Sequence, residues 1–371
     1  MRKLFHQITS TSFHRLVEEA VNQGKIPLGY TCGYVPQVML SVGHLFPYRM
    51  RAPETTSTEI ADIYLSNMGC GYTRSLLESA MDDQYHFLGG WVLAASCNQM
   101  HRLYDNLVYL LKPDFIHILD VPHKTGEAAL NWYIEELRLL RKKMEAHFDV
   151  DMGDHALAQA IDRHNAFQSQ LRAIGDLRLE IAPPLSGADY HDLLTAASTL
   201  PMDDMHAKIV EYHDLLKKAA PLKPHRARLM LVGGEMDDPE FIRTIETAGA
   251  LVVADHMCTG SIPGMGVIES VNDPIRDIAV HYLRKISCPR MMENFSVRLG
   301  SILETAEKYQ VEGIILHHIK FCDMWGVENR ILMNAIKKTG IPTLCLEREY
   351  ALTGEGQLKT RVQAFLERLG K

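Results

Sequence analysis

The chain has 371 residues, of which 46% are hydrophobic and 23% charged, and its formal net charge is −7. These values are ordinary for a globular protein and exclude a disordered or collagen-like chain. The acidic balance argues against a protein that binds nucleic acid or an anionic membrane. No apolar run reaches the ~18 residues of a membrane-spanning helix, and the N-terminus lacks the pattern of a signal peptide. We therefore expect a cytoplasmic protein with no membrane partner.

Strands and helices alternate over residues 1–125. After a helical N-terminus, apolar runs predict strands at 26–36, 45–52, 87–97 and 115–122, and helical spacing predicts helices at 38–44, 75–81 and 99–111. The strands are mostly continuous apolar runs, as expected for parallel strands that are buried on both faces. This stretch is predicted to form an N-terminal α/β domain.

Residues 126–222 carry helical spacing and almost no strand pattern, so we expect a helical segment there. A second alternation follows over residues 223–371. It has predicted strands at 226–235, 250–258, 312–322 and 341–349, and helices at 239–249, 274–286, 293–309, 329–340 and 356–369. The sequence thus predicts an α/β protein with two doubly wound, flavodoxin- or Rossmann-like parallel-sheet domains on either side of a helical segment.

Seven cysteines are scattered along the chain, and no two form a Cys-x-x-Cys pair. Four of them fall at or just past the carboxyl end of a predicted strand: Cys32, Cys97, Cys258 and Cys322. Cys70 and Cys288 lie in loops or helix starts beside that edge, which is where open α/β sheets bind their ligands. Cys345 lies inside a predicted strand and is interpreted as an ordinary core residue.

Several kinds of chemistry use cysteines. Separate buried thiols are the simplest interpretation, because free cysteine is among the most buried residue types. Disulfides are not expected in a reducing compartment. Structural zinc usually has paired ligands a few residues apart, and a single reactive nucleophile would leave the other thiols unexplained. Soft thiolates at long spacing suit an iron–sulfur cluster held by cysteines from separate loops.

Two blocks of sequence resemble one superfamily. The first contains "GCGYTRSLLESAM" (69–81) and "AASCNQMHRLYDNL" (94–107); the second contains "LVGGEMDDPEFIRTIETAGALVVADHMCTGS", "CPR", "VEGIILHHIKFCD" and "IPTLCLEREYALTGEGQLKTRVQAFLE". In this order they resemble the 2-hydroxyacyl-CoA dehydratase and benzoyl-CoA reductase subunit superfamily. The resemblance spans about residues 25–120 and 225–370, whereas the helical middle carries no recognisable motif.

The resemblance implies an iron–sulfur cofactor. Subunits of this superfamily with one [4Fe–4S] cluster bind it through three cysteines, which match Cys70, Cys97 and Cys322 here. A branch of double-cubane-cluster proteins adds three more, which match Cys32, Cys258 and Cys288. Because the chain resembles this branch most, we expect six thiolates to hold an [8Fe–9S] double cubane, with a single [4Fe–4S] cluster as the alternative.

The resemblance also implies a function. The chain would be the iron–sulfur reductase component of an ATP-dependent oxidoreductase. It would receive low-potential electrons from an ATP-hydrolysing activator, itself a [4Fe–4S] protein, and pass them to a hard-to-reduce substrate, as a homodimer or as a heterodimer with a related subunit. Two alternatives stay open. One is a single-cluster subunit of an acyl-CoA enzyme, a dehydratase or benzoyl-CoA reductase, acting on a CoA thioester; the other is a non-catalytic electron-transfer subunit.

Four further residues are candidates for catalysis. His317 and His318 would face opposite sides of one strand. One of them would donate a proton or contact a cluster sulfur; the alternative is that both only make hydrogen bonds within the fold. Arg74 and Ser75 open the helix after Cys70 and would stabilise a negative cluster or substrate, although Ser75 is equally suited to a helix N-cap. The loop 234–238 lacks a phosphate-binding glycine pattern, so the ATP site is assigned to the partner.

Overall fold

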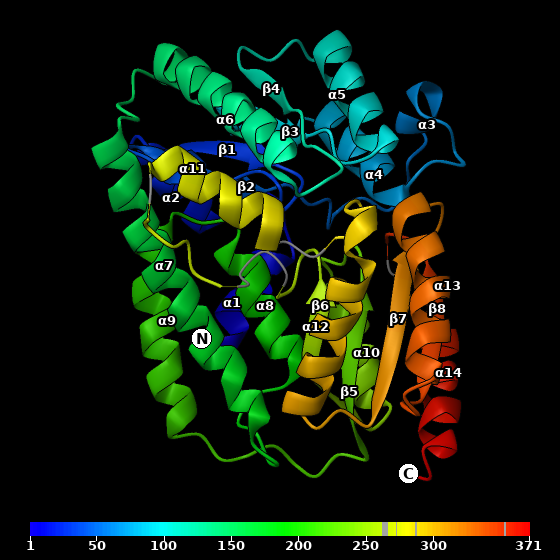
Figure 1. Ribbon diagram of the computed structural model, residues 1–371. Coiled ribbons are helices and arrows are strands. Elements are labelled where there is room, and N and C mark those ends of the chain that lie inside the picture. The colour runs from blue at the N-terminus through cyan, green and yellow to red at the C-terminus, as the bar shows by residue number, and fades with distance from the viewer. Residues whose placement is uncertain (262–265, 272, 286–287, 352–353) are drawn as a thin grey trace.

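The computed structural model describes residues 1–261, 266–271, 273–285, 288–351 and 354–371. In this part of the chain, two four-stranded parallel sheets lie one above the other in the view of Figure 1, and helices pack on their faces. The prediction of an α/β fold with two parallel-sheet domains is therefore confirmed. No described helix is long and apolar enough to cross a bilayer.

The first sheet has the strand order β2-β1-β3-β4, and its neighbouring strands are parallel. Its strands are β1 (Ile26–Tyr30), β2 (Leu45–Arg49), β3 (Gly90–Ala94) and β4 (Ile116–Leu119). The helical elements of this half are α1 (Arg2–Thr9), α2 (Arg15–Asn22), the 3₁₀ turn η1 (Met39–Ser41), α3 (Ala61–Tyr64), α4 (Gly71–Met81) and α5 (Asn98–Leu110). The strands β2 and β3 are buried throughout, as expected for parallel strands covered on both faces.

The second sheet has the corresponding order, β6-β5-β7-β8, again with parallel neighbours. Its strands are β5 (Ala227–Gly233), β6 (Ala250–Met257), β7 (Gly313–Ile319) and β8 (Thr343–Arg348). The helical elements described in this half are α10 (Pro239–Thr247), α11 (Pro274–Val280), the π-helix η4 (His281–Lys285), the 3₁₀ turn η5 (Met292–Asn294), α12 (Phe295–Lys308), α13 (Asp323–Lys337) and α14 (Glu355–Arg368). The two halves therefore share one sheet topology.

Helices alone fill the stretch between the sheets, as predicted. They are α6 (Glu127–Phe148), α7 (Asp154–Asp176), the 3₁₀ turn η2 (Leu177–Leu179), α8 (Gly187–Ala197) and α9 (Met202–Lys217). Helix α6 packs against β4 of the first sheet, whereas α8 packs against β6 of the second. Because this segment covers both sheets, the domain limits at residues 125 and 222 stay predictions.

Some predicted helices differ from the structure. The helix expected at 38–44 is wrong, because only the short turn η1 forms there. Val38, Met39 and Leu40 are fully buried, so this run has no polar face and fills the core instead. Helix α13 begins at Asp323, several residues before the predicted start at 329. The helix expected at 274–286 forms as α11 and η4, and residue 286 lies outside the described residues.

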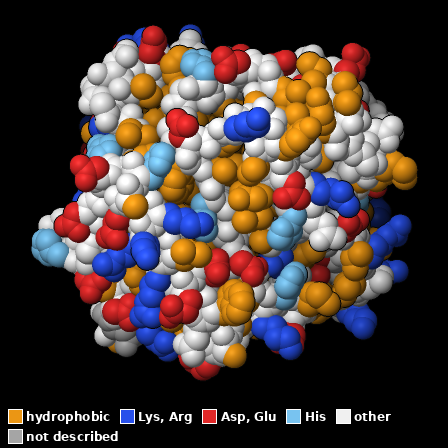
Figure 2. Space-filling model, turned by 90° about the horizontal axis from the view of Figure 1, so that it is seen from above, with side chains coloured by type: hydrophobic (Ala, Val, Ile, Leu, Met, Phe, Trp, Pro, Cys, Tyr) orange, Lys and Arg blue, Asp and Glu red, His pale blue; other side chains and the backbone are white. Residues whose placement is uncertain are grey.

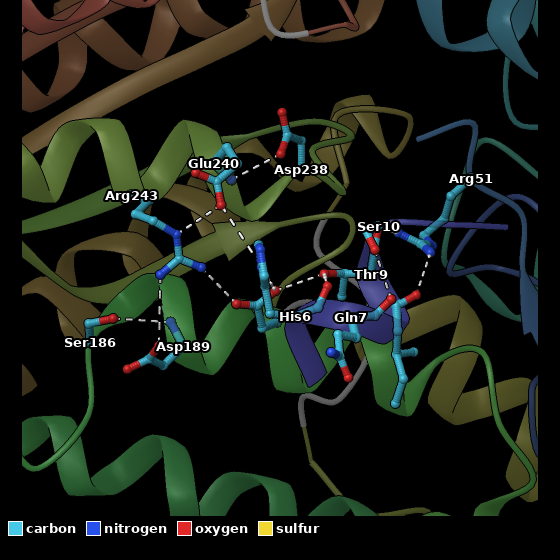
Figure 3. A network of polar contacts seen from close by, with 12 residues as sticks. His6, Gln7, Thr9, Ser10, Arg51, Ser186, Asp189, Asp238, Glu240 and Arg243 are labelled. Carbon is cyan, nitrogen blue, oxygen red and sulfur yellow. Dashed lines mark hydrogen bonds and ion pairs between the residues drawn. The ribbon is translucent and has the colours of Figure 1, made fainter. Parts of the chain in front are cut away.

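A polar network fastens α1 to α8 and α10 (Figure 3). At its centre is Asp192 of α8. One of its carboxylate oxygens accepts a hydrogen bond from Thr9 Oγ1 at 2.8 Å, and the other accepts one from Arg243 Nη2 at 2.9 Å. His6 Nδ1 lies 3.6 Å from the same carboxylate. Arg51, two residues past β2, donates from Nη1 to the carbonyl oxygen of Thr9 at 2.8 Å. The N-terminal helix is therefore anchored on the helical segment and on the C-terminal half as well as on its own half.

Candidate functional site

The carboxyl edges of the two sheets meet at the junction between the halves. Arg49, the last residue of β2, donates from Nη2 to Oε2 of Glu235, two residues past β5, at 2.6 Å. Arg290 of the C-terminal half donates from Nη1 to the carbonyl oxygen of Ser96, two residues past β3, at 2.6 Å. Both sheets thus present their ligand-binding edge to one shared region.

Six of the seven cysteines lie at this junction. Three of them are the N-cap residues of α4, α5 and α13, namely Cys70, Cys97 and Cys322. The other three lie in loops after β1, after β6 and ahead of α12, namely Cys32, Cys258 and Cys288. All are free thiols of intermediate exposure. The predicted convergence of cysteines from separate loops is therefore present in the structure.

Cys70, Cys97 and Cys322 form one group, here called the first triad. Burial raises the pKa of Cys70 to about 12, and the negative charges of Cys322 and Cys97 add to this effect. Burial also raises the pKa of Cys322 to about 11, with a contribution from Cys97. All three side chains also pack against the same hydrophobic cluster, which supports grouping them.

Cys32, Cys258 and Cys288 form a second triad. Burial raises the pKa of Cys258 well above its ordinary value, and the charges of Cys288 and Cys32 raise it further. Burial raises the pKa of Cys288 to about 12, again with a contribution from Cys32. Each triad thus takes two cysteines from one half of the chain and the third from the other half.

The two triads are neighbours. The charge of Cys32 acts on Cys97, and the charge of Cys288 acts on Cys322. Within the described ranges, no three His, Cys, Asp or Glu side chains lie close enough together to hold a single metal ion. A cubane does not require such closeness, because each of its thiolates binds a different iron. The arrangement therefore suits iron–sulfur clusters better than a mononuclear zinc site.

Helix N-termini favour negative charge at the first triad. The backbone N–H groups of Thr73 and Tyr72 lower the pKa of Cys70 and so oppose the larger effect of burial; Cys97 is placed in the same way at the start of α5. The positive end of the helix dipole acts in the same direction. Thiols lose their protons when they bind a metal. The residues of this region therefore fit an anionic, thiolate-bound cluster.

The two histidines of β7 face opposite sides of the strand. His317 is fully buried, its Nε2 lies 3.2 Å from Met257 Sδ, and burial lowers its pKa well below the ordinary value. His318 lies between Glu347 and Asn329, each 3.3 Å from a ring nitrogen. In the part of the chain that the structure describes, neither imidazole bonds to a cysteine. Their role in catalysis stays a prediction.

Arg74 and Ser75 lie on α4, beyond Cys70. Arg74 pairs with Asp62 of α3 at 2.9 Å, so a partner within its own half already meets its charge. Ser75 is buried inside the helix, which begins at Gly71. The alternative interpretation of Ser75 as an N-cap is therefore wrong, because Cys70 occupies that position. The roles of Arg74 and Ser75 toward a cluster stay predictions.

Cys345 lies outside both triads. It sits in β8 at the margin of the core, with its Sγ 3.4 Å from Met333 Sδ. No other thiol contributes to the raised pKa of Cys345, which is caused by burial. This cysteine therefore serves as a natural control for the other six.

A cavity of about 220 Å³ reaches the second triad. Helices α7 and α8 form one wall, and β6 with the loop that follows it forms another, which includes Cys258. Arg49 lines the cavity and is only 1% exposed. Sequence reasoning missed Arg49 and Glu235. Each is a charged residue at, or just after, the carboxyl end of an apolar strand, which could have marked it as a candidate. The sequence does not show, however, that the two residues pair across the halves.

Comparison with known proteins agrees with this architecture. Residues 32–369 match the model of the 2-hydroxyglutaryl-CoA dehydratase D-component family. The chain belongs to this family. The matched range begins at Cys32 and includes all six cysteines of the junction.

Three relatives match the chain over most of their length. The chain is 24% identical to YjiM of Escherichia coli (strain K12), provisionally named as a dehydratase subunit, over 98% of the chain and 97% of the relative. It is 19% identical to the (R)-phenyllactyl-CoA dehydratase beta subunit of Clostridium sporogenes over 98% and 97%. Its identity to a benzoyl-CoA reductase subunit of Thauera aromatica is 21%, over 85% and 83%. The chain is therefore an enzyme of the dehydratase and benzoyl-CoA reductase superfamily.

Proposed function

We propose that this chain is the iron–sulfur reductase component of a two-component system and that its six junction cysteines hold an [8Fe–9S] double cubane. Each triad would bind one cubane, with a bridging sulfide between them. The observation that carries the proposal is the convergence of six thiols, three and three, from separate loops of both halves.

The surroundings of the triads support an anionic cofactor of this kind. Such a cofactor would supply one-electron chemistry at low potential. The protein's own contribution is to bind it through thiolates and to offset its negative charge. Burial raises the pKa values of Cys97, Cys288 and Cys258; the charge of Arg290 opposes this rise at Cys97 and Cys288, and the charge of Arg49 opposes it at Cys258. Both guanidinium groups are buried, so water screens their charge little.

Partners complete the proposed system. An ATP-hydrolysing [4Fe–4S] activator would deliver the electrons. The chain itself carries neither the dinucleotide-binding pattern G-x-G-x-x-G nor the phosphate-binding loop with the Walker lysine. A second copy or a related subunit would complete the assembly, as the names of the relatives suggest for those proteins. Figure 2 shows apolar side chains gathered on the face that carries α5 and α6, where Tyr109 is 73% and Trp132 56% exposed. Exposed aromatic residues of this kind are typical of interaction surfaces.

The proposal is tested by measuring iron and acid-labile sulfide in anaerobically purified protein. We expect about eight irons per chain in the wild type, because a cubane holds about four. Cys258→Ser and Cys70→Ser should each lower the iron content, since each removes a ligand of one triad. Cys345→Ser is the matched control and should leave the iron content unchanged. Wild-type protein without iron would refute the proposal.

The relatives named as dehydratase and reductase subunits favour a second candidate function. In it, the first triad alone holds a [4Fe–4S] cluster, and the chain is one subunit of a heteromeric acyl-CoA enzyme. This alternative predicts about four irons per chain, their loss in Cys70→Ser, and no change in Cys258→Ser. The two candidate functions therefore predict different iron contents for the wild type and for Cys258→Ser, and this measurement decides between them.

A further inference from the structure

The cavity that reaches Cys258 is a site of its own. We propose that it binds a small organic anion, whose acidic head contacts Arg49 beside Cys258 and whose short apolar part lies along α7 and α8. Because Cys258 lines the same cavity, this inference deepens the proposed function. That the bound anion is the substrate rests on the proposed function.

The first observation is a buried guanidinium with unused donors. Nη2 of Arg49 bonds to Glu235, but Nε and Nη1 are buried and make no hydrogen bond of regular geometry. The guanidinium lies beside Tyr30, with Cζ 5.4 Å from the centre of the ring. Buried polar groups are nearly always hydrogen-bonded, so a cavity-lining guanidinium with two such donors has capacity for a further acceptor beside the Tyr30 hydroxyl. An anion is the acceptor that a guanidinium binds most strongly.

The second observation is the charge of the cavity wall. Its lining includes four cationic side chains but only two carboxylates: Arg49, Arg172, Arg178 and Lys308 against Asp176 and Asp255. Lys308 is 54% exposed and pairs with Asp176 at 3.0 Å, whereas Arg49 is buried. Arg178 lies 3.8 Å from Asp255, whereas Glu235, the partner of Arg49, does not line the cavity. The wall that a ligand meets therefore carries more cationic than acidic side chains, which favours a negative ligand.

The third observation is the size and polarity of the space. A volume of about 220 Å³ is smaller than the roughly 300–1,000 Å³ of pockets for drug-sized ligands, so a molecule of the size of coenzyme A would not fit inside it as a whole. Phe167, Leu171 and Leu194 provide an apolar wall. An organic anion with a short tail, such as a short-chain carboxylate, matches these properties better than an inorganic oxyanion.

The test uses ligand-observed NMR of the full chain, purified anaerobically, with propionate as the probe. Propionamide, which has nearly the same shape but no charge, and inorganic sulfate are the comparison ligands. We expect propionate to bind at least about tenfold more tightly than propionamide, because only propionate forms charged hydrogen bonds with Arg49. Sulfate should compete weakly, because it makes no use of the apolar wall.

Variants locate the binding. The double variant Arg49→Gln with Glu235→Gln removes the guanidinium without leaving a buried charge, and it should weaken propionate binding about tenfold. Lys308→Gln is safer for folding, because the side chain is exposed, and it should weaken binding about threefold. Lys25→Gln is its matched control. Lys25 also pairs with an aspartate, Asp204 at 2.7 Å, but it does not line this cavity.

Three results would overturn the inference. These are equal binding of propionate and propionamide, unchanged propionate binding in the double variant, and equal losses in Lys308→Gln and Lys25→Gln. Iron is measured in the same samples, so the two proposals fail separately. Propionate binding that depends on Arg49 in a chain without iron would refute the proposed function alone. A chain with about eight irons and no propionate binding would refute this site alone.

Discussion

The two halves of this molecule have the same sheet topology but place their cysteines differently. Cys97 and Cys322 are equivalent, since each is the N-cap of the helix between the third and fourth strands of its sheet. The next positions diverge. Cys32 follows β1, whereas Glu235 follows the equivalent strand β5. Cys258 follows β6, whereas the equivalent strand β2 ends in Arg49. At these two positions, the half that lacks the thiol has a charged residue.

The connections between the first two strands of each sheet also differ, and neither half forms a triad alone. The connection from β5 to β6 contains a regular helix, α10, but the connection from β1 to β2 contains only η1. That loop carries Cys32 to the second triad, whose other two cysteines belong to the C-terminal half. Conversely, Cys322 joins the first triad, whose other members are N-terminal. The candidate site is therefore assembled by docking of the halves, and changes that act within one half should differ from changes that act between them.

The largest expected effect lies within the C-terminal half. Arg298 is fully buried, donates to Glu328 at 2.6 Å, and also binds the carbonyl oxygen of Cys288 at 3.0 Å. Arg298→Met would leave the Glu328 carboxylate buried without a partner, so the free energy of unfolding should fall by about 3–5 kcal/mol in a urea titration. Arg74→Met in the N-terminal half is the control. Its partner Asp62 is partly exposed, and about 1 kcal/mol or less is expected. Equal losses would contradict the comparison.

Acid should destabilise both sheets through buried histidines. Burial, and secondarily Lys143, lower the pKa of His117 on β4 to about 4. An unfolded histidine has a pKa near 6.5, so between about pH 6.5 and 4 the unfolded chain binds the proton that the folded chain does not. The free energy of unfolding should therefore decrease as the pH falls through this interval, by about 3 kcal/mol for His117.

His117→Gln removes this contribution from the first sheet, and its unfolding free energy should depend less on pH than that of the wild type. His317→Gln tests the equivalent effect in the second sheet, because burial also lowers the pKa of His317. The measurement is a series of urea titrations from pH 7 to pH 4.5. Parallel curves for His117→Gln and the wild type would show that the buried imidazole does not cause the acid sensitivity.

Much of the fold could be predicted because the information is local. Buried parallel strands are apolar runs in the sequence, and cysteines such as Cys97 and Cys258 stand directly after such runs. The prediction of a helix at 38–44 is wrong because a local pattern is all that it rests on. The apolar pattern at 38–42 does not say whether it forms a helix or a buried loop, and only the packing around η1 decides this.

No local pattern in the sequence gives the composition of the triads, because it depends on how the halves dock; only the family resemblance implies the two sets of three. Nothing near Cys32 in the sequence indicates that it lies beside Cys288 rather than Cys70. Arg49 and Glu235 were missed for the same reason, since each is a single charge next to an apolar strand. Only the structure shows that they form a buried ion pair across the junction. Local patterns therefore locate the individual ligands, and tertiary contacts group them.

A smaller effect is expected from a single hydroxyl between the halves. Tyr350 donates to the buried carboxylate of Asp237 at 2.5 Å and accepts a hydrogen bond from the backbone N–H of Ala52 at 3.0 Å. Tyr350→Phe should lower the free energy of unfolding by about 2 kcal/mol, because both partners stay buried without it. It should also accelerate amide hydrogen exchange at Ala52.

Tyr85→Phe is the matched control within one half. Its hydroxyl donates to the carbonyl oxygen of Arg51 at 2.6 Å and is also buried. We expect a loss of about 1 kcal/mol, since only one uncharged acceptor is left without its donor. Hydrogen exchange at Ala52 should stay at the wild-type rate. If both variants accelerate this exchange equally, Tyr350 does not hold the halves together in the way proposed.

The smallest effect should come from α1, which connects the N-terminus to α8. Thr9→Val removes the hydrogen bond to Asp192 but leaves Arg243 on the other carboxylate oxygen, so the buried charge keeps its main partner. The expected loss of unfolding free energy is about 1 kcal/mol. Iron content should not change, because the main contact of α1 is with α8 and Thr9 itself bonds to Asp192. Loss of iron in this variant would mean that the N-terminal helix also positions the junction, and the molecule would then depend on three docked parts rather than on two halves.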